Sequence, residues 1–339
     1  MYDIQENISL KEYNTFGLEA NARYFCEIKS KEDLIKLISS DLFKKSKYLI
    51  LGGGSNILLT SDYDGLVIKN NICGQEIIEE NEAFVKIRSY SGNVWHELVI
   101  YCVNNGWGGI ENLSLIPGSV GAAPMQNIGA YGVELKNVFE SLEAIELSTG
   151  KLKTFSKADC KFDYRQSIFK NKLKDKFFIY SINLKLSKSP DINTSYGAIK
   201  DTLKEMKISD PGIKDVSNAV ISIRRSKLPD PIVLGNSGSF FKNPIIENGF
   251  YNKIKKTYPN IVGYPNGETH TKVAAGWLIE QCGFKGKRVG NTGSHKDQAL
   301  VLVNYGNAKG EEIWSLAKNI KKSVKETFGI DIDPEVNII

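Results

Sequence analysis

The sequence has few of the residues that form disulfides and metal sites. Its 339 residues include 5 cysteines and 3 histidines. The cysteines are isolated, odd in number and never spaced as C-x-x-C, so reduced thiols in a cytosolic protein are the simplest interpretation. His96, His270 and His295 lack the spacing of metal ligands, and we therefore expect no structural metal.

Long apolar runs and blocks of like charge are also absent. The N-terminal segment MYDIQENISLKEYNTFG is polar, and no apolar run reaches the roughly 18 residues of a membrane span. We therefore expect a cytoplasmic protein with neither a signal peptide nor a membrane-spanning segment. The net charge of +5 is spread along the chain, so it weakly favours an anionic ligand and gives no reason to expect nucleic acid.

The hydrophobic pattern predicts strands and helices in alternation, and a chain of 339 residues suggests two or three domains. Residues 187–212 are polar and predict a linker or long loop, and the turn sequence KLPDP at residues 227–231 predicts a domain boundary. The predicted strands are residues 22–28, 48–51, 66–69, 83–90, 142–147, 177–186 and 299–303. Two helices are predicted to begin at Ser30 and at Asn93. Three more are predicted to cover residues 215–225, 271–282 and 311–328.

One stretch, LSLIPGSVGAAPMQNIGAYG at residues 113–132, combines four glycines with no lysine or arginine. Glycine allows the backbone to approach a ligand closely. The donors of such a segment would be backbone N–H groups, which bind phosphates when they are arranged in a concave array. Composition alone is equally compatible with a glycine-rich turn between strands.

A second segment, YLILGGGSN at residues 48–56, is a short apolar strand that runs into glycines. A strand that leads into a glycine loop is a common place for a pyrophosphate. The segment lacks the G-x-G-x-x-G spacing of a dinucleotide fingerprint and the lysine of a P-loop. The two usual nucleotide-binding folds are therefore disfavoured.

Ser239 is a candidate proton donor in the segment NSGSFFKNP, residues 236–244. A serine hydroxyl in a dry pocket lined by Phe240 and Phe241 can give up a proton if charges nearby stabilise the alkoxide. The segment is not a G-x-S-x-G nucleophile elbow. From the residues alone, a serine that hydrogen-bonds its own turn is the favoured interpretation.

Three charged side chains complete the candidate site. Arg165, which lies among aromatic residues in FDYRQSIFK, can bind a carboxylate with two hydrogen bonds or form a structural ion pair. Glu335 in the tail sequence IDPEV is either a surface carboxylate or part of a tail that is pinned into the fold. Lys227 is either a substrate-binding cation or a solvated loop residue.

Taken together and in order, these segments resemble the family of UDP-N-acetylenolpyruvoylglucosamine reductases (UDP-N-acetylmuramate dehydrogenases), flavoproteins of bacterial peptidoglycan precursor synthesis. The resemblance covers essentially the whole chain, from NTFG at Asn14 through ILGGGSN, ENLSLIPGSVGAAPMQNIGAYG, FDYRQSIFK, KLPDP, GSFFKNP and AAGWLIEQCG to DPEV. Several long motifs in the right order are far more specific than any single one. The segment that carries Tyr196 resembles the form of the family with a substrate-covering tyrosine loop.

The resemblance implies an α+β protein with an FAD-binding fold of the vanillyl-alcohol-oxidase (PCMH) type in two subdomains, plus a third α/β domain that binds substrate. We expect these parts at residues 1–68, 69–212 and 213–328, with the tail 329–339 returning to the active site. FAD would bind without a covalent bond. The residues implied to contact it are Leu51, Gly52, Gly53, Gly54, Ser55, Asn56, Ile116, Pro117, Gly118, Gly121, Ala122, Ala123, Gln126, Asn127, Gly129, Ala130, Tyr131 and Gly132.

The chain departs from many relatives at Ala122 and Ala123, where those relatives have hydroxyls, so backbone N–H groups would serve there. The resemblance also implies NADPH as the co-substrate and the enolpyruvyl ether of UDP-N-acetylglucosamine as the acceptor of hydride from the reduced flavin. Addition of hydride β to a carboxylate builds an enediolate-like charge. The resemblance implies that Arg165 and a proton-sharing Glu335 stabilise this charge and that Ser239 supplies the proton.

The same resemblance implies substrate contacts from six side chains and no macromolecular partner. We expect a monomer that binds only small molecules. The implied substrate-binding residues are Tyr164, Tyr196, Arg224, Lys227, Asn243 and His295, and Arg225 beside Arg224 leaves the choice between these two arginines open. Two other functions are compatible with the residues: an oxidase of the same flavin fold that uses dioxygen, and a nucleotide-binding regulatory protein without catalysis.

Overall fold

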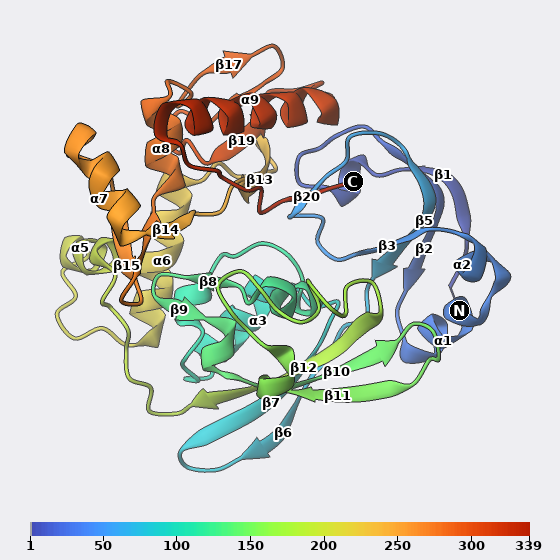
Figure 1. Cartoon of the computed structure of the whole chain (residues 1–339). Coiled ribbons are helices and arrows are strands. Elements are labelled where there is room, and N and C mark those ends of the chain that lie inside the picture. Colours follow the sequence, from blue (N-terminus) through green and yellow to red (C-terminus); the bar gives the residue numbers. More distant parts are fainter. Residues whose placement is uncertain (1) are drawn as a thin grey trace. The chain divides into compact units, whose positions relative to one another are not determined.

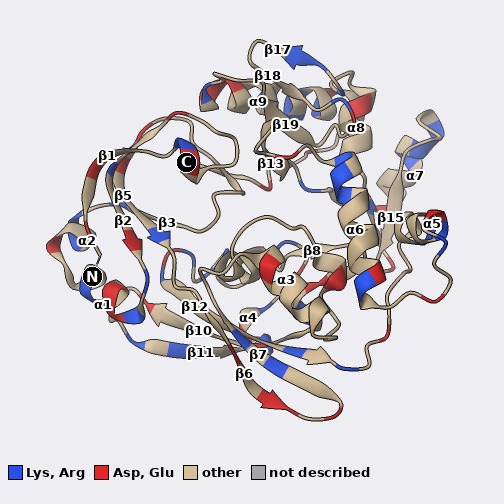
Figure 2. Ribbon diagram, turned by 180° about the vertical axis from the view of Figure 1, so that it is seen from behind, with Lys and Arg blue, Asp and Glu red and all other residues tan. Residues whose placement is uncertain are grey.

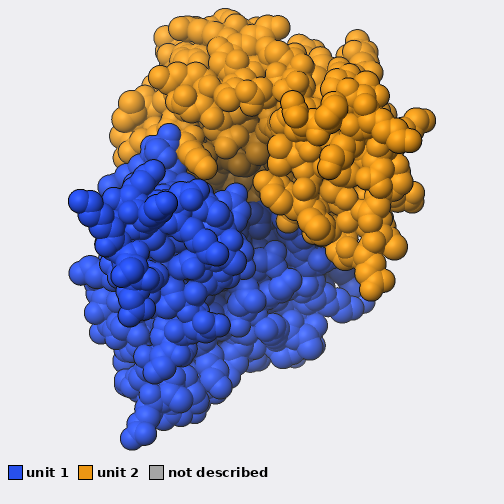
Figure 3. All heavy atoms as spheres, turned by 90° about the vertical axis from the view of Figure 1, so that its left-hand side faces the viewer, with its two compact units in different colours: residues 1–8, 22–53, 64–226 blue, residues 9–21, 54–63, 227–339 orange. Residues whose placement is uncertain are grey.

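The computed structural model describes residues 2–339 (Figure 1), and the chain divides into two compact units (Figure 3). Unit 1 comprises residues up to 8, 22–53 and 64–226, and unit 2 comprises residues 9–21, 54–63 and 227–339. The last crossing, between Ser226 and Lys227, falls at the start of the KLPDP turn. The finer division into three domains stays a prediction.

The first sheet of unit 1 has the order β1-β2-β5-β3. Its strands are β1 (Gln5–Ser9), β2 (Asn21–Ile28), β3 (Tyr48–Leu51) and β5 (Tyr63–Asn70), and β3 runs parallel to β5. Helices α1 (Lys31–Ser39) and α2 (Asp41–Lys45) connect β2 to β3. The side chain of Ser30 accepts a hydrogen bond from Asp33 N and begins α1, as predicted. Leu34 and Leu37 are fully buried in the hydrophobic cluster of this sheet.

The second sheet of unit 1 is antiparallel with the order β11-β10-β12-β7-β6. Its strands are β6 (Gln75–Glu80), β7 (Phe84–Tyr90), β10 (Phe139–Glu146), β11 (Leu152–Ser156) and β12 (Phe177–Ser187). Helices α3 (Trp95–Asn104) and α4 (Lys157–Cys160) accompany it, and the segment between α3 and β10 contains η2 (Glu111–Leu113), η3 (Val120–Gln126), β8 (Gly129–Ala130), β9 (Val133–Glu134) and η4 (Leu135–Asn137). The apolar face of α3 is buried and includes Leu98, Val99, Cys102 and Val103.

Two helices end unit 1, and the first corrects a prediction. Residues 187–212 were expected to be a linker or long loop, but α5 (Gly197–Glu205) lies within them, followed by α6 (Ile213–Lys227). Ile199 and Leu203, one turn apart on α5, are buried in one cluster with Val216 and Val220 of α6. The polar segment is therefore helical because α6 offers its apolar face, which the composition of the segment alone does not reveal.

Unit 2 has two antiparallel sheets, with the orders β13-β19-β18-β17 and β14-β16-β15. Its strands are β13 (Gly235–Ser239), β14 (Ile245–Glu247), β15 (Gly263–Asn266), β16 (His270–Val273), β17 (Arg288–Val289), β18 (Thr292–Ser294) and β19 (Val301–Asn304). Its helices are η1 (Lys11–Tyr13), α7 (Asn248–Thr257), α8 (Ala275–Gln281) and α9 (Gly310–Phe328). In addition, β20 (Asn337–Ile338) pairs in parallel with β4 (Ile57–Leu58).

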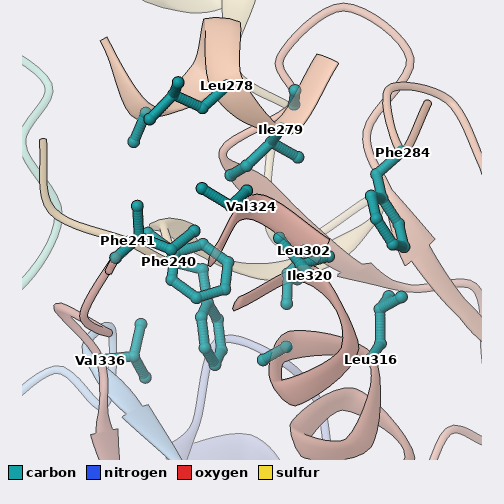
Figure 4. Close-up of a cluster of buried hydrophobic side chains, with 14 of the residues drawn as sticks. Phe240, Phe241, Leu278, Ile279, Phe284, Leu302, Leu316, Ile320, Val324 and Val336 are labelled. Carbon is teal, nitrogen blue, oxygen red and sulfur yellow. The ribbon is translucent and has the colours of Figure 1, made fainter. Parts of the chain in front are cut away.

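One hydrophobic cluster forms the core of unit 2 (Figure 4). It joins Phe240 and Phe241 to side chains of α8, α9 and the C-terminal tail, including Leu278, Ile320 and Val336. The helix α9 contributes the predicted apolar stripe and ends at Gly329, which adopts φ 71°.

Two local predictions are wrong. The predicted helix 271–282 begins as strand β16, since Thr271 and Val273 alternate into the core and the strand is paired on both sides; the helix α8 starts only at Ala275. Asn93 does not cap α3. Its side chain instead donates to Gly74 O at 2.7 Å and accepts from Gly74 N at 2.9 Å, and the residue that precedes the helix is Val94.

Candidate functional site

The two glycine-rich segments that the sequence singled out lie against each other in unit 1. Strand β3 ends at the buried Leu51, and the chain continues through Gly52 and Gly53. A Cβ atom at Gly53 would lie 2.9 Å from Gly118 Cα, and one at Gly52 would overlap the Ser119 hydroxyl. Only glycine permits this approach. The two segments therefore present one continuous stretch of backbone.

The remaining residues of the first glycine loop belong to unit 2. Gly54 O accepts a hydrogen bond from Thr15 N at 3.2 Å. Asn56 O accepts from Asn337 N at 3.0 Å, and the Asn56 side chain donates to Glu335 O at 3.3 Å. The loop is thus tied to the C-terminal tail in unit 2.

The second glycine segment is fastened to the first turn of α3 within unit 1. Trp95 N donates to Gly118 O at 3.0 Å, and Trp95 Nε1 donates to Leu113 O at 3.1 Å. Gly121 N donates to Ser91 O at 2.9 Å. These bonds hold both ends of the segment that contains Ile116 and Pro117.

Residues 122–127 form the next part of the predicted cofactor surface. Ala122 is exposed and Ala123 is buried. Gln126 accepts a hydrogen bond from Lys170 Nζ at 3.2 Å. Asn127 is fully buried with φ 44°; its side chain donates to Glu134 Oε2 and accepts from Lys136 N, so it holds the hairpin that follows.

That hairpin, β8–β9, turns at Tyr131 and Gly132. Their φ angles are 50° and 81°, which is the left-handed pair that a two-residue turn between antiparallel strands requires. Gly129 O, at the start of the hairpin, accepts a hydrogen bond from Arg165 Nη2 at 2.7 Å. The hairpin therefore fixes the guanidinium of the candidate charge-stabilising residue.

Arg165 itself lies in a tight turn with strained backbone. It has φ 54°, and Asp163 and Gln166 on either side exchange backbone hydrogen bonds of 3.1–3.2 Å. The guanidinium lies 5.4 Å from the centre of the Tyr164 ring. Left-handed backbone at a residue other than glycine is uncommon and recurs at functional sites.

Three further predicted residues of unit 1 meet beside the hairpin. The rings of Tyr131 and Tyr196 pack edge to face with their centres 5.2 Å apart, and Arg224 lies close enough to interact electrostatically with the Tyr131 hydroxyl. Burial raises the pKa of Tyr131 and lowers that of Arg224. Tyr196, 44% exposed, precedes α5. The last turns of α6 are basic (Figure 2), and of the two adjacent arginines it is Arg224 that faces this cluster, whereas Arg225 is exposed.

In unit 2, Ser239 lies at the end of β13, after a bulge that contains Gly238 with φ 67°. The expected hydrogen bond between the serine and its own turn is not made, since Asn236 Oδ1 accepts from Gly238 N at 2.9 Å instead. Within residues 2–339, no hydrogen bond engages the Ser239 hydroxyl. Phe240 and Phe241, the expected apolar lining, are instead buried in the hydrophobic core of unit 2 (Figure 4).

Glu335 is held beside this strand. Its backbone N–H donates to Phe240 O at 2.8 Å, and Pro334 forms a bridge with Phe241. The Glu335 side chain is half-buried. The hypothesis of a pinned tail is therefore correct, and Glu335 and Ser239 come from adjacent, hydrogen-bonded segments of one unit.

The other candidates of unit 2 differ in how far they are engaged. The side-chain oxygen of Asn243 accepts from Ala275 N at 2.9 Å and so begins α8. His295 N donates to Val301 O at 2.8 Å, and Val301 pairs with Ser239. Burial lowers the pKa of His295. Lys227 is exposed.

Two residues of unit 1 that touch the glycine segments were not found from the sequence. Lys69 on β5 donates from Nζ to Gly52 O at 2.7 Å, and burial lowers its pKa. His96 on α3 is half-buried, and its Nδ1 accepts from Leu115 N at 2.9 Å. Lys69 stands opposite Leu51 in the parallel pair of β3 and β5, and the strand pattern of the sequence does not reveal this pairing.

Other kinds of site find no support in the described residues. Among residues 2–339, no group of His, Cys, Asp and Glu side chains could hold a metal ion. Burial raises the pKa of the Cys26, Cys102 and Cys160 thiols to about 12, so these three cysteines are unreactive core residues. No helix within the described range has the length and apolarity of a membrane span.

Comparisons with known proteins agree with this geometry. A family model described as "FAD binding domain" matches residues 22–156, and one described as "UDP-N-acetylenolpyruvoylglucosamine reductase, C-terminal domain" matches residues 230–339. Among solved structures, UDP-N-acetylenolpyruvylglucosamine reductase from Thermus caldophilus is similar over 100% of this chain and 99% of that chain, with a TM-score of 0.68 and 22% identity. A solvent-stable cholesterol oxidase is similar over 98% and 86%, with a TM-score of 0.50 and 10% identity.

Curated relatives are much closer in sequence. The UDP-N-acetylenolpyruvoylglucosamine reductase of Flavobacterium johnsoniae is 55% identical and covers 99% of this chain and 100% of its own. The reductases of Amoebophilus asiaticus and Pseudomonas aeruginosa are 49% and 43% identical, each over 99% of both chains.

The fold and the glycine surface define an FAD-containing oxidoreductase with an α+β fold of the vanillyl-alcohol-oxidase (PCMH) type, as predicted. The residues present fit such a cofactor: Gly53 lies against the backbone of Gly118, Gly52 lies against Ser119, and the Lys69 ammonium lies beside Gly52. The chain belongs to the UDP-N-acetylenolpyruvoylglucosamine reductase family.

Proposed function

We propose that this protein reduces the enolpyruvyl group of UDP-N-acetylglucosamine enolpyruvate to UDP-N-acetylmuramate, with NADPH as reductant, in the synthesis of peptidoglycan precursors. Family membership supports the substrate class, since relatives at 43–55% identity over 99% of the chain carry the reductase name. The structural observation that carries the proposal is the pairing of the Glu335 segment with the Phe240 segment, which places an unengaged serine and a carboxyl on neighbouring segments.

The cofactor would be held mainly by backbone. Residues 51–56 and 116–132 would contact FAD without a covalent bond, and Lys69 would add positive charge near the first glycine. Held there, FAD would supply the redox chemistry, which is transfer of hydride from NADPH to the methylene carbon of the enolpyruvyl group. Because the two glycine segments carry no acidic side chain, they do not repel a diphosphate.

Ser239 would supply the proton to the carbon that bears the carboxylate. Hydride addition at the methylene carbon leaves negative charge on the neighbouring carbon and its carboxylate, and this charge is removed only when a proton arrives. The Ser239 hydroxyl is suited to this step, because it forms no hydrogen bond within residues 2–339. Its position at the end of β13 is fixed by the pairing with Val301.

Arg165 and Glu335 would stabilise the enediolate-like charge before the proton arrives. The Arg165 guanidinium is fixed by Gly129 O, so little reorganisation is needed when the charge develops. A carboxyl group that shares a proton can donate a hydrogen bond to the same charge, whereas a bare carboxylate would oppose it. We assign this role to Glu335.

The substrate would be bound by a set of polar and aromatic side chains. Arg224 and Lys227 are suited to the diphosphate or carboxylate, and Tyr196, at 44% exposure, can cover a bound ligand. We assign the remaining contacts to Tyr164, Asn243 and His295. We further propose that the protein works as a cytoplasmic monomer, which size-exclusion chromatography with light scattering would test.

The decisive experiment separates the two half-reactions of Ser239→Ala by stopped-flow absorbance of the flavin. We expect reduction by NADPH at the wild-type rate, and reoxidation by the enolpyruvyl substrate slower by roughly 10²–10⁴-fold, as for the loss of a general acid. Ser237→Ala is the matched control, because this buried serine on the same strand bonds Ile57 O. Wild-type reoxidation in Ser239→Ala would refute the role of Ser239.

A further inference from the structure

Leu115, next to the proposed flavin contacts, has an unusual backbone that two side chains hold. It is not glycine, yet its φ is 57°. Its N–H donates to His96 Nδ1 at 2.9 Å, and its carbonyl oxygen accepts from Arg224 Nε at 3.1 Å. The left-handed conformation costs an L-residue about 1–2 kcal/mol. The two side-chain bonds offset that cost.

The same turn of α3 also holds the residues on both sides. Trp95, which precedes His96, bonds Leu113 O through Nε1 and Gly118 O through its backbone N–H. The segment from residue 113 to residue 118 is therefore attached to α3 at three points. Only Ile116 and Pro117 lie between the attachment points at Leu115 and Gly118. The bond from Leu115 to His96 therefore sets the direction in which their backbone runs.

We infer that His96 is a positioning residue for the flavin, which holds Leu115 in the left-handed conformation so that Ile116, Pro117 and Gly118 present their backbone to FAD. This inference rests on the assignment of these three residues to the FAD site. His96 itself needs no contact with FAD or substrate. Removal of its acceptor leaves a partly buried N–H group without a partner and frees Leu115 to relax to an ordinary conformation.

The bond requires an unprotonated Nδ1, because only then can this nitrogen accept the Leu115 N–H. The charged groups that face the imidazole are Arg224 and Arg225 of α6 and Glu97 of α3. Burial lowers the pKa of His96, the two arginines lower it further, and Glu97 opposes them. The imidazole is therefore neutral at pH 7. Protonation at lower pH breaks the bond and places a cation beside the arginines.

The test measures FAD binding to apoprotein by quenching of flavin fluorescence between pH 5 and 8, without NADPH or substrate. For His96→Leu we expect a Kd at least about 5-fold above wild type at pH 8, since an unsatisfied N–H typically costs 1–3 kcal/mol, and a smaller difference as the pH falls and wild type loses the same bond. In His96→Asn the amide oxygen replaces Nδ1 as acceptor and does not titrate. This variant is expected to bind as wild type at pH 8 and to stay constant as the pH falls, whereas the wild-type Kd rises as the pH falls through the lowered pKa of His96, below the ordinary histidine value of about 6.5.

Hydrogen exchange of the Leu115 amide provides a second readout. Exchange is expected to be fast in His96→Leu and slow in His96→Asn at pH 7. Wild-type FAD affinity in His96→Leu would overturn the inference, and so would an identical pH dependence in wild type and His96→Asn. The reductase proposal can fail without affecting either measurement, because both are made without turnover.

Discussion

The candidate cations of unit 1 and the candidate proton donor of unit 2 are presented in opposite ways. In unit 1, Arg165 and Lys69 each donate to the carbonyl oxygen of a glycine, Gly129 and Gly52, at 2.7 Å. In unit 2, the Ser239 hydroxyl has no hydrogen-bond partner within residues 2–339, although its backbone is paired with Val301.

This difference corresponds to two chemical tasks. A cation that stabilises developing charge acts best when it is fixed before the reaction, because no reorganisation is then needed. A group that releases a proton must instead not donate that proton to another acceptor in a hydrogen bond. It must also be protonated again after each turnover. The fixed groups of unit 1 and the unengaged hydroxyl of unit 2 fit these roles.

The largest effect in unit 1 is expected from Arg165→Lys. Lysine keeps the positive charge but lacks the planar guanidinium, which can donate to Gly129 O and to a substrate oxygen at the same time. We expect kcat to fall by roughly 10²–10³-fold, the range for loss of one preorganised donor. Steady-state kinetics with the enolpyruvyl substrate measures this change, and Arg23→Lys, at the exposed pair with Asp64, is the control. A kcat within twofold of wild type would show that a fixed guanidinium is not required.

A smaller effect is expected at the contact between the glycine segments. In Gly53→Ala the new Cβ would lie 2.9 Å from Gly118 Cα, which is backbone and cannot move aside alone. We expect the Kd for FAD to rise about tenfold, equivalent to 1.4 kcal/mol. Fluorescence titration of the apoprotein measures it.

Gly238→Ala in unit 2 is the matched control for this contact. A Cβ there meets no atom within 4 Å, and only its φ of 67° is unfavourable. The free energy of unfolding should therefore decrease by about 1 kcal/mol with an unchanged Kd for FAD. Equal losses of FAD affinity in Gly53→Ala and Gly238→Ala would contradict the assignment of the glycine surface to unit 1.

The smallest effect is expected from Lys69→Met, which keeps the aliphatic stem and removes the ammonium. Loss of the bond to Gly52 O and of one positive charge should raise the Kd for FAD about 3–10-fold at low salt. The difference from wild type should shrink at high salt, because charge interactions are screened. Titrations at two ionic strengths distinguish this result from a purely steric effect, which salt would not change.

Much of the fold could be predicted from local pattern. The strand Tyr48–Leu51 and a helix shortly after Asn93 were predicted correctly because their apolar spacing is dense. Helix α5 was not predicted because only Ile199 and Leu203 form its buried face. These two residues are buried because they pack against α6. Strand β16 was taken for helix because Val273 and the following residues continue a helical apolar pattern, and its pairing on both sides is not visible in the sequence.

The residues of the candidate site could be predicted only in part from the sequence. The glycine segments and the residues Ser239, Arg165 and Glu335 belong to motifs and could be named, although their roles stay proposals. Lys69 and His96 act on backbone atoms 17 and 19 residues away, and no spacing rule links a side chain to such a carbonyl or amide. The unengaged state of Ser239 was also hidden, since a nearby asparagine, Asn236, replaces it in the turn.

The interleaved division of the chain has a consequence for biosynthesis. The core of unit 2 needs Phe16 and Leu18 from the first segment and Leu58 from the second, but most of its partners lie beyond residue 227. Early in translation these apolar side chains are therefore exposed to water or bound by a chaperone, while some two hundred further residues emerge from the ribosome at about 5–20 residues per second. A gene split at residue 226 would leave the later fragment without part of its core, so the two products should fold only when they are expressed together.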